Sequence, residues 1–468
     1  MKKTKIVGSI GPASNNYETF KKLVKAGLNV ARVNFSHATL EERQIVEDLV
    51  QKINNEENQN IGLLFDTKGP EFRNGLIENN EVALEAGHNI RIVKENIIGN
   101  ANQFSVNHPQ AIDSLKVGDT VLLVNGLIRL EVISKEEDGV TCTIKNGGML
   151  GSHKSMSVPG VDLNIPFISE TDYEDITYAC KHNGDFLALS FVSRKEDVLA
   201  AKEILKENGR EDMQIISKIE SVTGIENLDE IVELSDGIMV ARGDLGVEVP
   251  MEMLPIYQKK IISKCREKGK VCIVATEMLV SMKKSIRPTR AEVSDVANAV
   301  FNGTDAVMLS DETTIGHYPV ETVEAMAQIC ENAEKYYNYD KEFNVTWASN
   351  ITETIAKSVI TASKTLNAKL IVATTMSGRT ARKISNLKPC TTVLATVPSK
   401  KIARSLALNY NVYPVIVDEY NSTDEVIEHG IKAAKEFMKL EAKDKIIITG
   451  GFPNSGNRVT NFMKIEEI

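Results

Sequence analysis

The fold is decided by two neighbouring stretches, Ile215-Ile216-Ser217-Lys218-Ile219-Glu220 and Gly237-Ile238-Met239-Val240-Ala241-Arg242-Gly243-Asp244. Each begins as a short apolar run, which is typical of a buried strand, and each ends in charged residues. Because side chains two positions apart on a strand share a face, Lys218 and Glu220 point the same way. The two stretches therefore predict a sheet whose functional groups gather where its strands end.

The same rhythm of short strands and helices extends to both sides of these stretches. Strands are expected at 5–10, 30–35, 61–65, 186–191, 214–219, 237–241, 271–275 and 306–309, and helices at 17–26, 40–53, 195–205, 255–268 and 291–301. Eight such units favour an α/β fold of the closed (β/α)₈ type, a TIM barrel, whose site lies at the carboxyl ends of its strands. On pattern alone, a doubly wound two-domain arrangement is the alternative.

Two further segments break the barrel rhythm. Residues 70–160 show alternating runs at 120–124, 128–133 and 140–144, which predict a small all-β module between Gly69-Pro70 and Pro159-Gly160. From about residue 345, a helix at 351–366 and strands at 370–374, 392–397, 412–417 and 445–449 predict an open α/β domain. The expected domain limits are 1–69 with 161–344 for the barrel, 70–160 for the insertion and 345–468 for the last domain.

Composition excludes several classes of protein. The 468 residues carry a net charge of −9, with 42% hydrophobic and 25% charged residues, which is typical of a globular protein. The acidic balance argues against nucleic-acid binding, and no apolar run approaches the 18 residues of a membrane span. The six cysteines form no Cys-x-x-Cys pair, so a disulfide framework or thiolate zinc site is not expected. We expect a cytoplasmic protein.

Polar residues follow the predicted strands, as an active barrel requires. They are Arg32, Asn34 and Ser36; Asp66, Thr67 and Lys68; Thr276 and Glu277; and Ser310, Asp311 and Glu312. Lys218 and Glu220 form either a simple ion pair or a lysine beside a carboxylate that binds a divalent metal. Asp244 is either a second such carboxylate or a turn residue, and two hard oxygen ligands suit Mg²⁺. Arg32 could instead extend to solvent, and Asn34 and Ser36 could cap a helix.

The last domain offers a candidate phosphate cradle. Thr375-Met376-Ser377-Gly378-Arg379-Thr380 follows a strand and opens a helix, where backbone N–H groups, hydroxyls and an arginine can hold phosphate. An ordinary helix cap explains the same residues equally well. The glycine-rich loop 450–456 could close over the cradle, but it continues with Asn457-Arg458 and is not a Walker A motif.

At this point the chain resembles the pyruvate kinase family over essentially its whole length. The matching segments are 29–37, 66–71, 216–220, 239–248 and 287–292, continuing to Ser310. The resemblance implies a barrel, a small β-barrel lid domain inserted at 70–160 and a C-terminal α/β domain. It also implies phosphoryl transfer from phosphoenolpyruvate to ADP, with Mg²⁺ or Mn²⁺ and usually K⁺ as cofactors.

The resemblance also implies roles for individual residues. Glu220 and Asp244 would hold the divalent metal, Lys218 would neutralise the transferring phosphoryl group, and Arg32 would bind phosphate. Further expected contacts are Gly243 and Thr276 with substrate, Thr276 and Ser310 as a proton relay, and Arg73 and Lys154 with the nucleotide. The expected K⁺ ligands are Asn34, Ser36, Asp66 and the Thr67 carbonyl, and Glu71 goes with K⁺ dependence in this family.

The resemblance to this family also implies how the protein is regulated and assembled. Thr375, Ser377, Gly378, Arg379 and Thr380 are similar to the family's site for a phosphorylated effector, either a sugar phosphate or a nucleotide monophosphate. A homotetramer is expected. The sequence ends soon after Asn461, so we expect it to lack the extra C-terminal domain of some bacterial relatives.

Several positions depart from the family pattern. They are Ala38 and Asp311 in place of glycine, Glu277 in place of glutamine, Ser157-Val158 in place of Asn-Leu, and Asn125 where aspartate is common. Asp311 adds a carboxylate beside the expected relay, so we expect turnover to be slower than in an Asp311→Gly variant.

Two other functions compete with the kinase. A barrel aldolase or lyase would use Lys218 as a Schiff-base nucleophile. A non-catalytic sensor would keep the phosphate cradle of the last domain and bind sugar phosphates without turnover.

Overall fold

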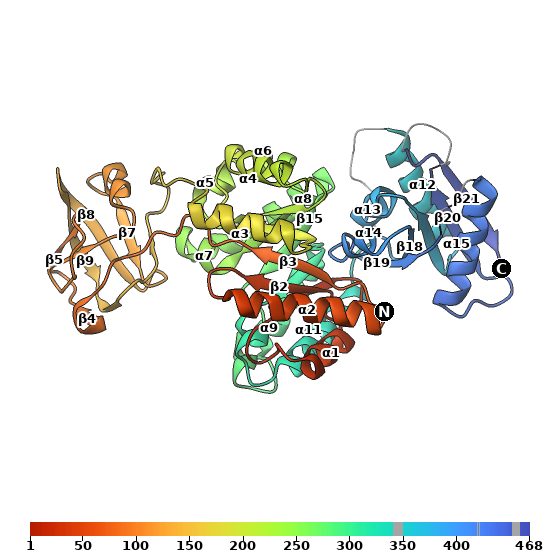
Figure 1. The fold of residues 1–468 in the computed structure, drawn as a ribbon, viewed down its shortest axis with the longest axis horizontal. Helices are drawn as coiled ribbons and strands as arrows, with labels where there is room; N and C mark the ends of the chain where they lie inside the picture. Colours follow the sequence, from red (N-terminus) through yellow and green to blue (C-terminus); the bar gives the residue numbers. More distant parts are fainter. Residues whose placement is uncertain (340–349, 419, 421, 452–458) are drawn as a thin grey trace.

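The computed structural model describes residues 1–339, 350–418, 420, 422–451 and 459–468. Figure 1 shows three bodies in a row, with the inserted β domain at one end, the barrel in the middle and the C-terminal domain at the other end. The residues of the predicted loop 450–456 beyond Gly451 lie outside the described residues, as does the predicted domain limit at 345.

The barrel is closed by eight parallel strands in the order β1-β16-β15-β14-β13-β12-β3-β2. The strands are β1 (Lys5–Ser9), β2 (Val30–Asn34), β3 (Gly62–Asp66), β12 (Phe186–Leu189), β13 (Gln214–Ile219), β14 (Gly237–Ala241), β15 (Val271–Ala275) and β16 (Ala306–Leu309). The predicted TIM barrel is confirmed, and the doubly wound alternative is wrong, because β1 pairs with both β2 and β16. The predicted strand 186–191 ends earlier, at Leu189, since Phe191 takes a left-handed φ of 58°.

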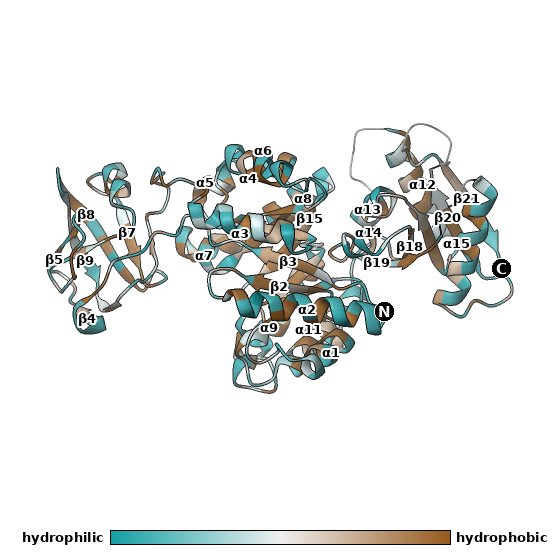
Figure 2. Cartoon of the chain, in the orientation of Figure 1, coloured by the Kyte–Doolittle hydropathy of each residue, from teal (hydrophilic) through white to brown (hydrophobic). Residues whose placement is uncertain are grey.

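Helices cover the outside of the barrel, with apolar residues turned inward (Figure 2). Their starts follow from capping side chains: Asn16 accepts from the Thr19 N–H, and Thr39 with Glu42 forms a capping box. The helices of this part are α1 (Tyr17–Ala26), α2 (Leu40–Glu56), α3 (Glu170–Lys181), α4 (Lys195–Glu207), α5 (Val222–Glu226), α6 (Leu228–Leu234), α7 (Arg242–Glu248), α8 (Leu254–Lys268), α9 (Arg290–Phe301), α10 (Asp311–Thr314) and α11 (Pro319–Glu334).

The segment between β3 and α3 contains the predicted β module. Its main sheet has six strands in the order β11-β7-β8-β9-β5-β6, and β4 pairs separately with β10. The strands are β4 (Glu81–Leu84), β5 (Asn89–Val93), β6 (Gln103–Ser105), β7 (Thr120–Leu123), β8 (Ile128–Glu136), β9 (Gly139–Asn146), β10 (Gly148–Gly151) and β11 (Met156–Ser157). The domain has its own buried apolar core, separate from that of the barrel.

The C-terminal domain is a five-stranded sheet in the order β19-β18-β17-β20-β21, as the predicted open α/β domain requires. Its elements are α12 (Ile351–Thr365), β17 (Leu370–Thr374), α13 (Arg379–Asn386), β18 (Val393–Val397), α14 (Lys400–Arg404), β19 (Val412–Ile416), α15 (Thr423–Phe437), β20 (Lys445–Gly450) and β21 (Phe462–Glu467). The sequence pattern missed β21, which pairs antiparallel with β20 at the edge of the sheet.

The C-terminal domain packs against the amino-terminal end of the barrel. Lys5, at the start of β1, donates to the Val412 carbonyl at 2.6 Å. Gln214, at the start of β13, donates to the Ser405 carbonyl at 2.7 Å. Because this domain covers the amino ends, the carboxyl ends of the strands face the inserted β domain.

Candidate active site

Two cavities meet at the carboxyl ends of the barrel strands. The smaller, about 140 Å³, lies over the barrel mouth and is lined by Arg32, Asn34, Ser36, Lys218, Thr276 and Ser310, among others. The larger, about 730 Å³, lies between the barrel and the inserted domain. Glu71, Phe191, Glu220 and Asp244 line both cavities. The site can therefore hold two ligands whose reacting ends meet beside these shared residues.

Lys218 lies at the centre of the barrel mouth, half-buried on β13. Its ammonium group is 3.1 Å from Asp66 Oδ1, 3.1 Å from Glu220 Oε1 and 2.7 Å from Ser190 Oγ. Burial alone would lower the pKa of Lys218, but the charges of Asp66 and Glu220 outweigh it and raise the pKa above its ordinary value. Lys218 is thus a fixed positive charge at the junction of the two cavities.

Arg32 and Asp66 supply a second buried ion pair. Arg32 Nε donates to Asp66 Oδ2 at 2.7 Å, and its Nη1 donates to Ser9 Oγ at 2.7 Å. Burial would raise the pKa of Asp66, but the charges of Arg32 and Lys218 lower it overall. One carboxylate therefore orients two cations toward the smaller cavity, which suits an anionic ligand.

Glu220 is buried, and one of its oxygens makes no hydrogen bond among the described residues. Its Oε2 accepts the Phe191 N–H at 2.6 Å, and Phe191 takes the left-handed backbone that aims this N–H. Its Oε1 makes no hydrogen bond among the described residues and contacts only the charge of Lys218. Burial raises the pKa of Glu220 to about 7, against the opposing effect of Lys218. A buried oxygen left in this state is costly unless a ligand completes it.

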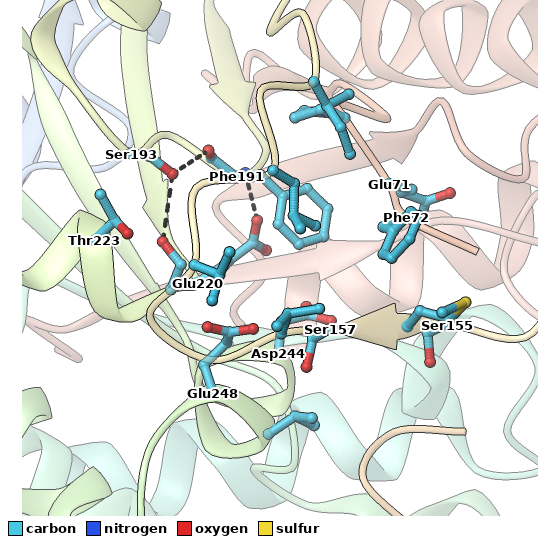
Figure 3. Close-up of a pocket in the computed structure, with 18 of the residues that line it drawn as sticks. Glu71, Phe72, Ser155, Ser157, Phe191, Ser193, Glu220, Thr223, Asp244 and Glu248 are labelled. Atoms are coloured by element: carbon cyan, nitrogen blue, oxygen red, sulfur yellow. Dashed lines mark hydrogen bonds between the residues drawn. The ribbon is translucent and has the colours of Figure 1, made fainter. Parts of the chain in front are cut away.

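Asp244 provides the second carboxylate. It is exposed at the first turn of α7 and lines both cavities together with Glu220. Figure 3 shows Glu220, Asp244 and Glu248 projecting into the larger cavity, with Glu71, Phe72 and Ser155 on its other side. Among the described residues, no group of three or more His, Cys, Asp and Glu could hold a metal. These two carboxylates, one of which has an oxygen without a hydrogen bond, fit Mg²⁺, which keeps waters and substrate oxygens in its shell.

Thr276 and Gly243 are joined at the carboxyl ends of β15 and β14. Thr276 Oγ1 accepts the Gly243 N–H at 2.7 Å and donates to the Ala275 carbonyl at 2.6 Å. Thr276 has a φ of 66° and Glu277 a φ of 53°, a conformation that a β-branched residue rarely adopts. Such strain persists only where surrounding contacts enforce it, and it is concentrated at functional sites.

Ser310 lines the same small cavity as Thr276. Its N–H donates to Glu312 Oε2 at 2.8 Å, and Glu312 Oε1 also accepts the Leu279 N–H. Burial raises the pKa of Glu312 against the opposing effect of these hydrogen bonds. Glu312 therefore positions the turn that presents the Ser310 hydroxyl to the cavity.

Asp311 does not crowd this hydroxyl. Its carboxylate is exposed and accepts from Lys283 Nζ at 2.8 Å, and Asp311 is not among the residues that line either cavity. The expectation that the Asp311 carboxylate lies beside the hydroxyls of Thr276 and Ser310 is wrong. The Asp311 side chain, at the start of α10, points away from the cavity and pairs with Lys283.

Two other residues that depart from the family pattern, Ala38 and Asn125, make specific contacts in the structure. The Ala38 carbonyl accepts from Arg43 Nε at 3.1 Å, and Ala38 packs against the barrel core. Asn125 lines the larger cavity, and its Oδ1 accepts from Ser155 Oγ at 2.7 Å. Asn125 thus contributes an uncharged wall where a carboxylate would repel phosphates.

The residues expected to hold K⁺ lie together beside Lys218. Asn34 and Ser36 line the smaller cavity, and Asn34 Oδ1 accepts the Ser36 N–H at 3.2 Å. Asp66 and Thr67 are buried behind them, and the Thr67 carbonyl accepts from Ser190 Oγ at 2.7 Å. These donors are all oxygens, the ligand type that hard cations prefer.

Arg73 and Lys154 lie on the side of the inserted domain and line the larger cavity. Arg73 forms a bidentate pair with Glu71 at 2.9 and 3.0 Å and donates to the His153 carbonyl at 2.8 Å. Lys154 is exposed. The inserted domain thus contributes two cations to the wall of the larger cavity.

The expected effector residues divide between two environments. Thr380 is buried, and its hydroxyl lies 2.8 Å from that of Thr460, while Thr375 is buried at the end of β17. Ser377 and Arg379 are exposed and line a separate cavity against the barrel. Gly378, with a φ of 79°, is the N-cap residue of α13, and no side chain caps this helix.

Sequence reasoning missed Ser190 and Phe191. Ser190 Oγ accepts from Lys218 and donates to the Thr67 carbonyl, and Phe191 holds Glu220. The rule that polar residues follow each barrel strand would have found Ser190, since it directly follows β12.

The fold and site define a barrel enzyme that handles phosphorylated anions. The family model for the pyruvate kinase barrel domain matches residues 1–323, and that for the pyruvate kinase alpha/beta domain matches residues 353–466. The chain therefore belongs to the pyruvate kinase family and is a phosphotransferase.

Curated and solved relatives agree with this assignment. A pyruvate kinase of Clostridium acetobutylicum is 42% identical, with 100% of both chains covered. One of Staphylococcus epidermidis is 43% identical over 99% of this chain and 80% of its own length. The crystal structure of a pyruvate kinase from Cryptosporidium parvum has a TM-score of 0.95 and 37% identity, covering 100% of this chain and 96% of that one.

Proposed function

We propose that this phosphotransferase moves the phosphoryl group of phosphoenolpyruvate to ADP, giving pyruvate and ATP in glycolysis. The observation that carries the proposal is Lys218, a fixed cation between Asp66 and Glu220 where two cavities meet. Phosphoenolpyruvate fits the smaller cavity beside Arg32, and ADP fits the larger cavity beside Arg73 and Lys154. Transfer between them needs positioning and charge neutralisation more than covalent chemistry.

The residues that line the two cavities are assigned different parts in this transfer. Arg32, oriented by Asp66, binds the phosphate of phosphoenolpyruvate, and the Gly243 turn and Thr276 position its carboxylate end. Lys218 neutralises the charge that develops on the phosphoryl group and on the enolate oxygen. The hydroxyls of Thr276 and Ser310 then hold the proton that reaches the enolate carbon.

The cations are assigned to two places. Glu220 and Asp244 would hold Mg²⁺ or Mn²⁺, which supplies charge neutralisation and orients phosphate oxygens when it is bound. Asn34, Ser36, Asp66 and the Thr67 carbonyl would hold K⁺. Glu71 adds a negative charge beside the K⁺ ligands, and in this structure its carboxylate forms an ion pair with Arg73.

The inserted domain is assigned the part of a lid over the larger cavity. Its closing brings Arg73 and Lys154 toward the nucleotide and excludes water from the barrel mouth. We assign residues 70–160 to the lid, 1–69 with 161–344 to the barrel and 345–468 to the C-terminal domain.

A lyase that uses Lys218 as a nucleophile is disfavoured. Such a lysine needs a lowered pKa to be uncharged, whereas Asp66 and Glu220 raise the pKa of Lys218. Borohydride trapping with carbonyl substrates should leave Lys218 unmodified.

Regulation, assembly and location are proposed from the family to which the chain belongs. Thr375, Ser377, Gly378, Arg379 and Thr380 are assigned to a phosphorylated effector, and the homotetramer stays a prediction that light scattering tests. No helix in the described ranges is long and apolar enough to cross a bilayer. The six cysteines are all free, which supports a cytoplasmic location.

A coupled assay tests the proposal. Pyruvate formation is measured with phosphoenolpyruvate and ADP, with Mg²⁺ and K⁺ present together or omitted in turn. We expect turnover with both cations and its loss without the divalent metal. Folded protein that forms no pyruvate under any of these conditions would contradict the proposal. If that protein still binds sugar phosphates, the non-catalytic sensor is favoured.

A further inference from the structure

Two segments of the chain connect the inserted β domain to the barrel (Figure 1). We call residues 67–71, which follow β3, the entry linker, and residues 158–169, which lie between β11 and α3, the return linker. Because each domain has its own packed core, movement of the inserted domain relative to the barrel takes place in these linkers. Such closures depend on a few residues that change their backbone angles while their neighbours stay fixed.

The packing of apolar side chains shows where each linker passes from one domain to the other. In the return linker, Val161, Leu163 and Ile165 pack against the core of the inserted domain. Phe167 packs against the barrel core instead. The entry linker ends at Phe72, which is buried in the inserted domain. The hinge of the proposed lid therefore lies between Ile165 and Phe167 in the return linker, and just before Phe72 in the entry linker.

Asp172, in the first turn of α3, bonds to both linkers on the barrel side of this hinge. Its Oδ1 accepts the Gly69 N–H of the entry linker at 2.9 Å. Its Oδ2 accepts the N–H of Ser169, at the end of the return linker, at 3.2 Å and the Ser169 hydroxyl at 2.6 Å. Asp172 is 1% exposed and forms no ion pair within the described part of the chain. A buried carboxylate without a cation depends on these three hydrogen bonds, so it holds the two linkers together.

The entry linker is also fixed by Ser190. Gly69 has a φ of 68°, and a Cβ there would lie 2.9 Å from the carbonyl oxygen and the Cβ of Ser190, so only glycine fits. Ser190 Oγ accepts from Lys218 and donates to the Thr67 carbonyl. Gly69 is thus bonded to Asp172 and packed against the serine that orients Lys218. The attachment of the inserted domain is therefore continuous with the barrel mouth.

Asp175, one turn further along α3, makes a different attachment. It is 5% exposed, and its Oδ1 accepts from Arg43 Nη1 of α2 at 2.7 Å. Among the described residues it makes no hydrogen bond to either linker. Two buried aspartates of one helix thus differ in what they hold, because Asp175 joins two barrel helices and Asp172 joins the barrel to both linkers.

We propose that Asp172 is a positioning residue of the lid, which fixes the hinge so that Arg73 and Lys154 reach the nucleotide in one orientation. The kinetic part of this inference rests on the proposed function, because it takes ADP as the ligand under the lid. With the hinge released, the lid also adopts orientations in which Arg73 and Lys154 miss the nucleotide. The fraction of protein that binds ADP productively then falls, and saturating ADP restores it. Loss of Asp172 therefore acts on the KM for ADP more than on kcat.

Asp172→Asn tests this with little change in side-chain size. The amide nitrogen cannot accept a hydrogen bond, so at least one linker is released. The KM for ADP should rise about tenfold or more, which is ~1.4 kcal/mol, while kcat and the KM for phosphoenolpyruvate should change by less than about threefold. Asp175→Asn is the matched control. It weakens a buried ion pair on the same helix and should change the KM for ADP by no more than about twofold.

The distance between the inserted domain and the barrel tests the hinge without catalysis. Pulsed electron paramagnetic resonance measures it between spin labels at the exposed positions Val117→Cys and Leu199→Cys, after Cys390→Ser has removed the exposed native thiol. The distribution of distances should be broader in Asp172→Asn than in the chain without that change. Asp175→Asn should leave the distribution as it is.

Ser169→Ala keeps the test valid if Asp172→Asn does not fold, because Ser169 is exposed and its hydroxyl gives one of the three hydrogen bonds. It should broaden the distances and raise the KM for ADP in the same direction. The inference is overturned if Asp172→Asn and Asp175→Asn have equal effects on the distances or on the KM for ADP. It is also overturned if folded Asp172→Asn leaves either quantity unchanged. If the unchanged chain forms no pyruvate, the proposed function fails, whereas the distance measurement still decides the inference.

Discussion

The two ends of the barrel both bury charged side chains, but they complete those charges in opposite ways. At the amino end, Lys388 lies 2.5 Å from Asp305 and also donates to the Thr304 carbonyl. Glu334 accepts the Thr4 N–H at 2.7 Å and the Lys3 N–H at 2.9 Å. Lys388 and Glu334 are thus completed by groups of the protein itself, and these contacts hold the C-terminal domain and the chain terminus in place.

At the carboxyl end the pairing is incomplete. Glu220 has one oxygen without a hydrogen bond, Asp244 is exposed in a cavity, and Phe191 and Thr276 take left-handed backbones. The comparison teaches that a buried charge is not by itself a sign of function. A buried charge indicates a functional site when groups of the protein do not supply all of its hydrogen bonds, because a bound ligand can then supply the missing ones.

Removing Lys218 should have the largest effect on activity. Lys218→Met takes away the cation between the cavities, so kcat should fall by about 10³-fold or more while the phosphoenolpyruvate cavity remains. Steady-state kinetics and substrate binding by fluorescence check this. Turnover within tenfold of the unchanged chain would show that Lys218 is only a structural ion pair.

Removing Lys388 at the other end should affect stability instead. Lys388→Met leaves Asp305 buried without its cation, which costs about 3–5 kcal/mol. Denaturant unfolding should show this loss, whereas kcat per folded molecule should change little. A large fall in kcat with unchanged stability would abolish the distinction between the two ends.

Lys5 predicts a pH dependence of stability at the amino end. Burial and the charge of Lys2 lower the pKa of Lys5 to about 7, against the opposing effect of Glu334. The Lys5 ammonium group donates to the Val412 carbonyl and lies over the Tyr413 ring. Above pH 7 the unfolded chain binds this proton more strongly than the folded one, so stability relative to Lys5→Met should rise with pH. Between pH 7 and 9 the gain should be about 2 kcal/mol.

The unfolding free energies of both chains at several pH values check the Lys5 prediction. Differences that stay constant from pH 7 to 9, or that fall with pH, would contradict it.

Ser190 should have a smaller effect on catalysis. Ser190→Ala removes the acceptor that holds Lys218 at 2.7 Å, so kcat should fall about tenfold. Ser217→Ala is the matched control, because Ser217 is buried against Ser235 on the same strand as Lys218 but lines neither active-site cavity. Equal effects of the two changes on kcat would reject a specific part for Ser190.

Asp311 should have the smallest effect. Its carboxylate pairs with Lys283 at the surface, so Asp311→Gly should change kcat by no more than about twofold. A tenfold increase would instead support the expectation from sequence that Asp311 disturbs the proton relay.

The barrel could be predicted from sequence because its strands are short, buried runs bounded by turn residues. The predicted limits of β13, β14, β15 and β16 match the structure to the residue. The edge strand β21 was missed because it is only half-buried, so its apolar pattern is weak.

The residues of the site were harder to place than the strands. Charged residues such as Lys218 and Glu220 stand out within an apolar run, but Ser190 does not, because a serine near a strand end has many ordinary explanations. The backbone of Phe191, which directs its N–H to Glu220, has no signal in the sequence. The outward direction of Asp311 depends on Lys283, which is distant in sequence.

Binding of Mn²⁺, measured by electron paramagnetic resonance with phosphoenolpyruvate present, tests the central contrast most directly. Glu220→Gln removes the charge of the incompletely paired carboxylate, and Glu334→Gln does the same to the fully paired one at the other end. We predict that Glu220→Gln weakens Mn²⁺ binding about tenfold or more, and that Glu334→Gln leaves it unchanged. Mn²⁺ binding that is unaffected by Glu220→Gln would contradict the account.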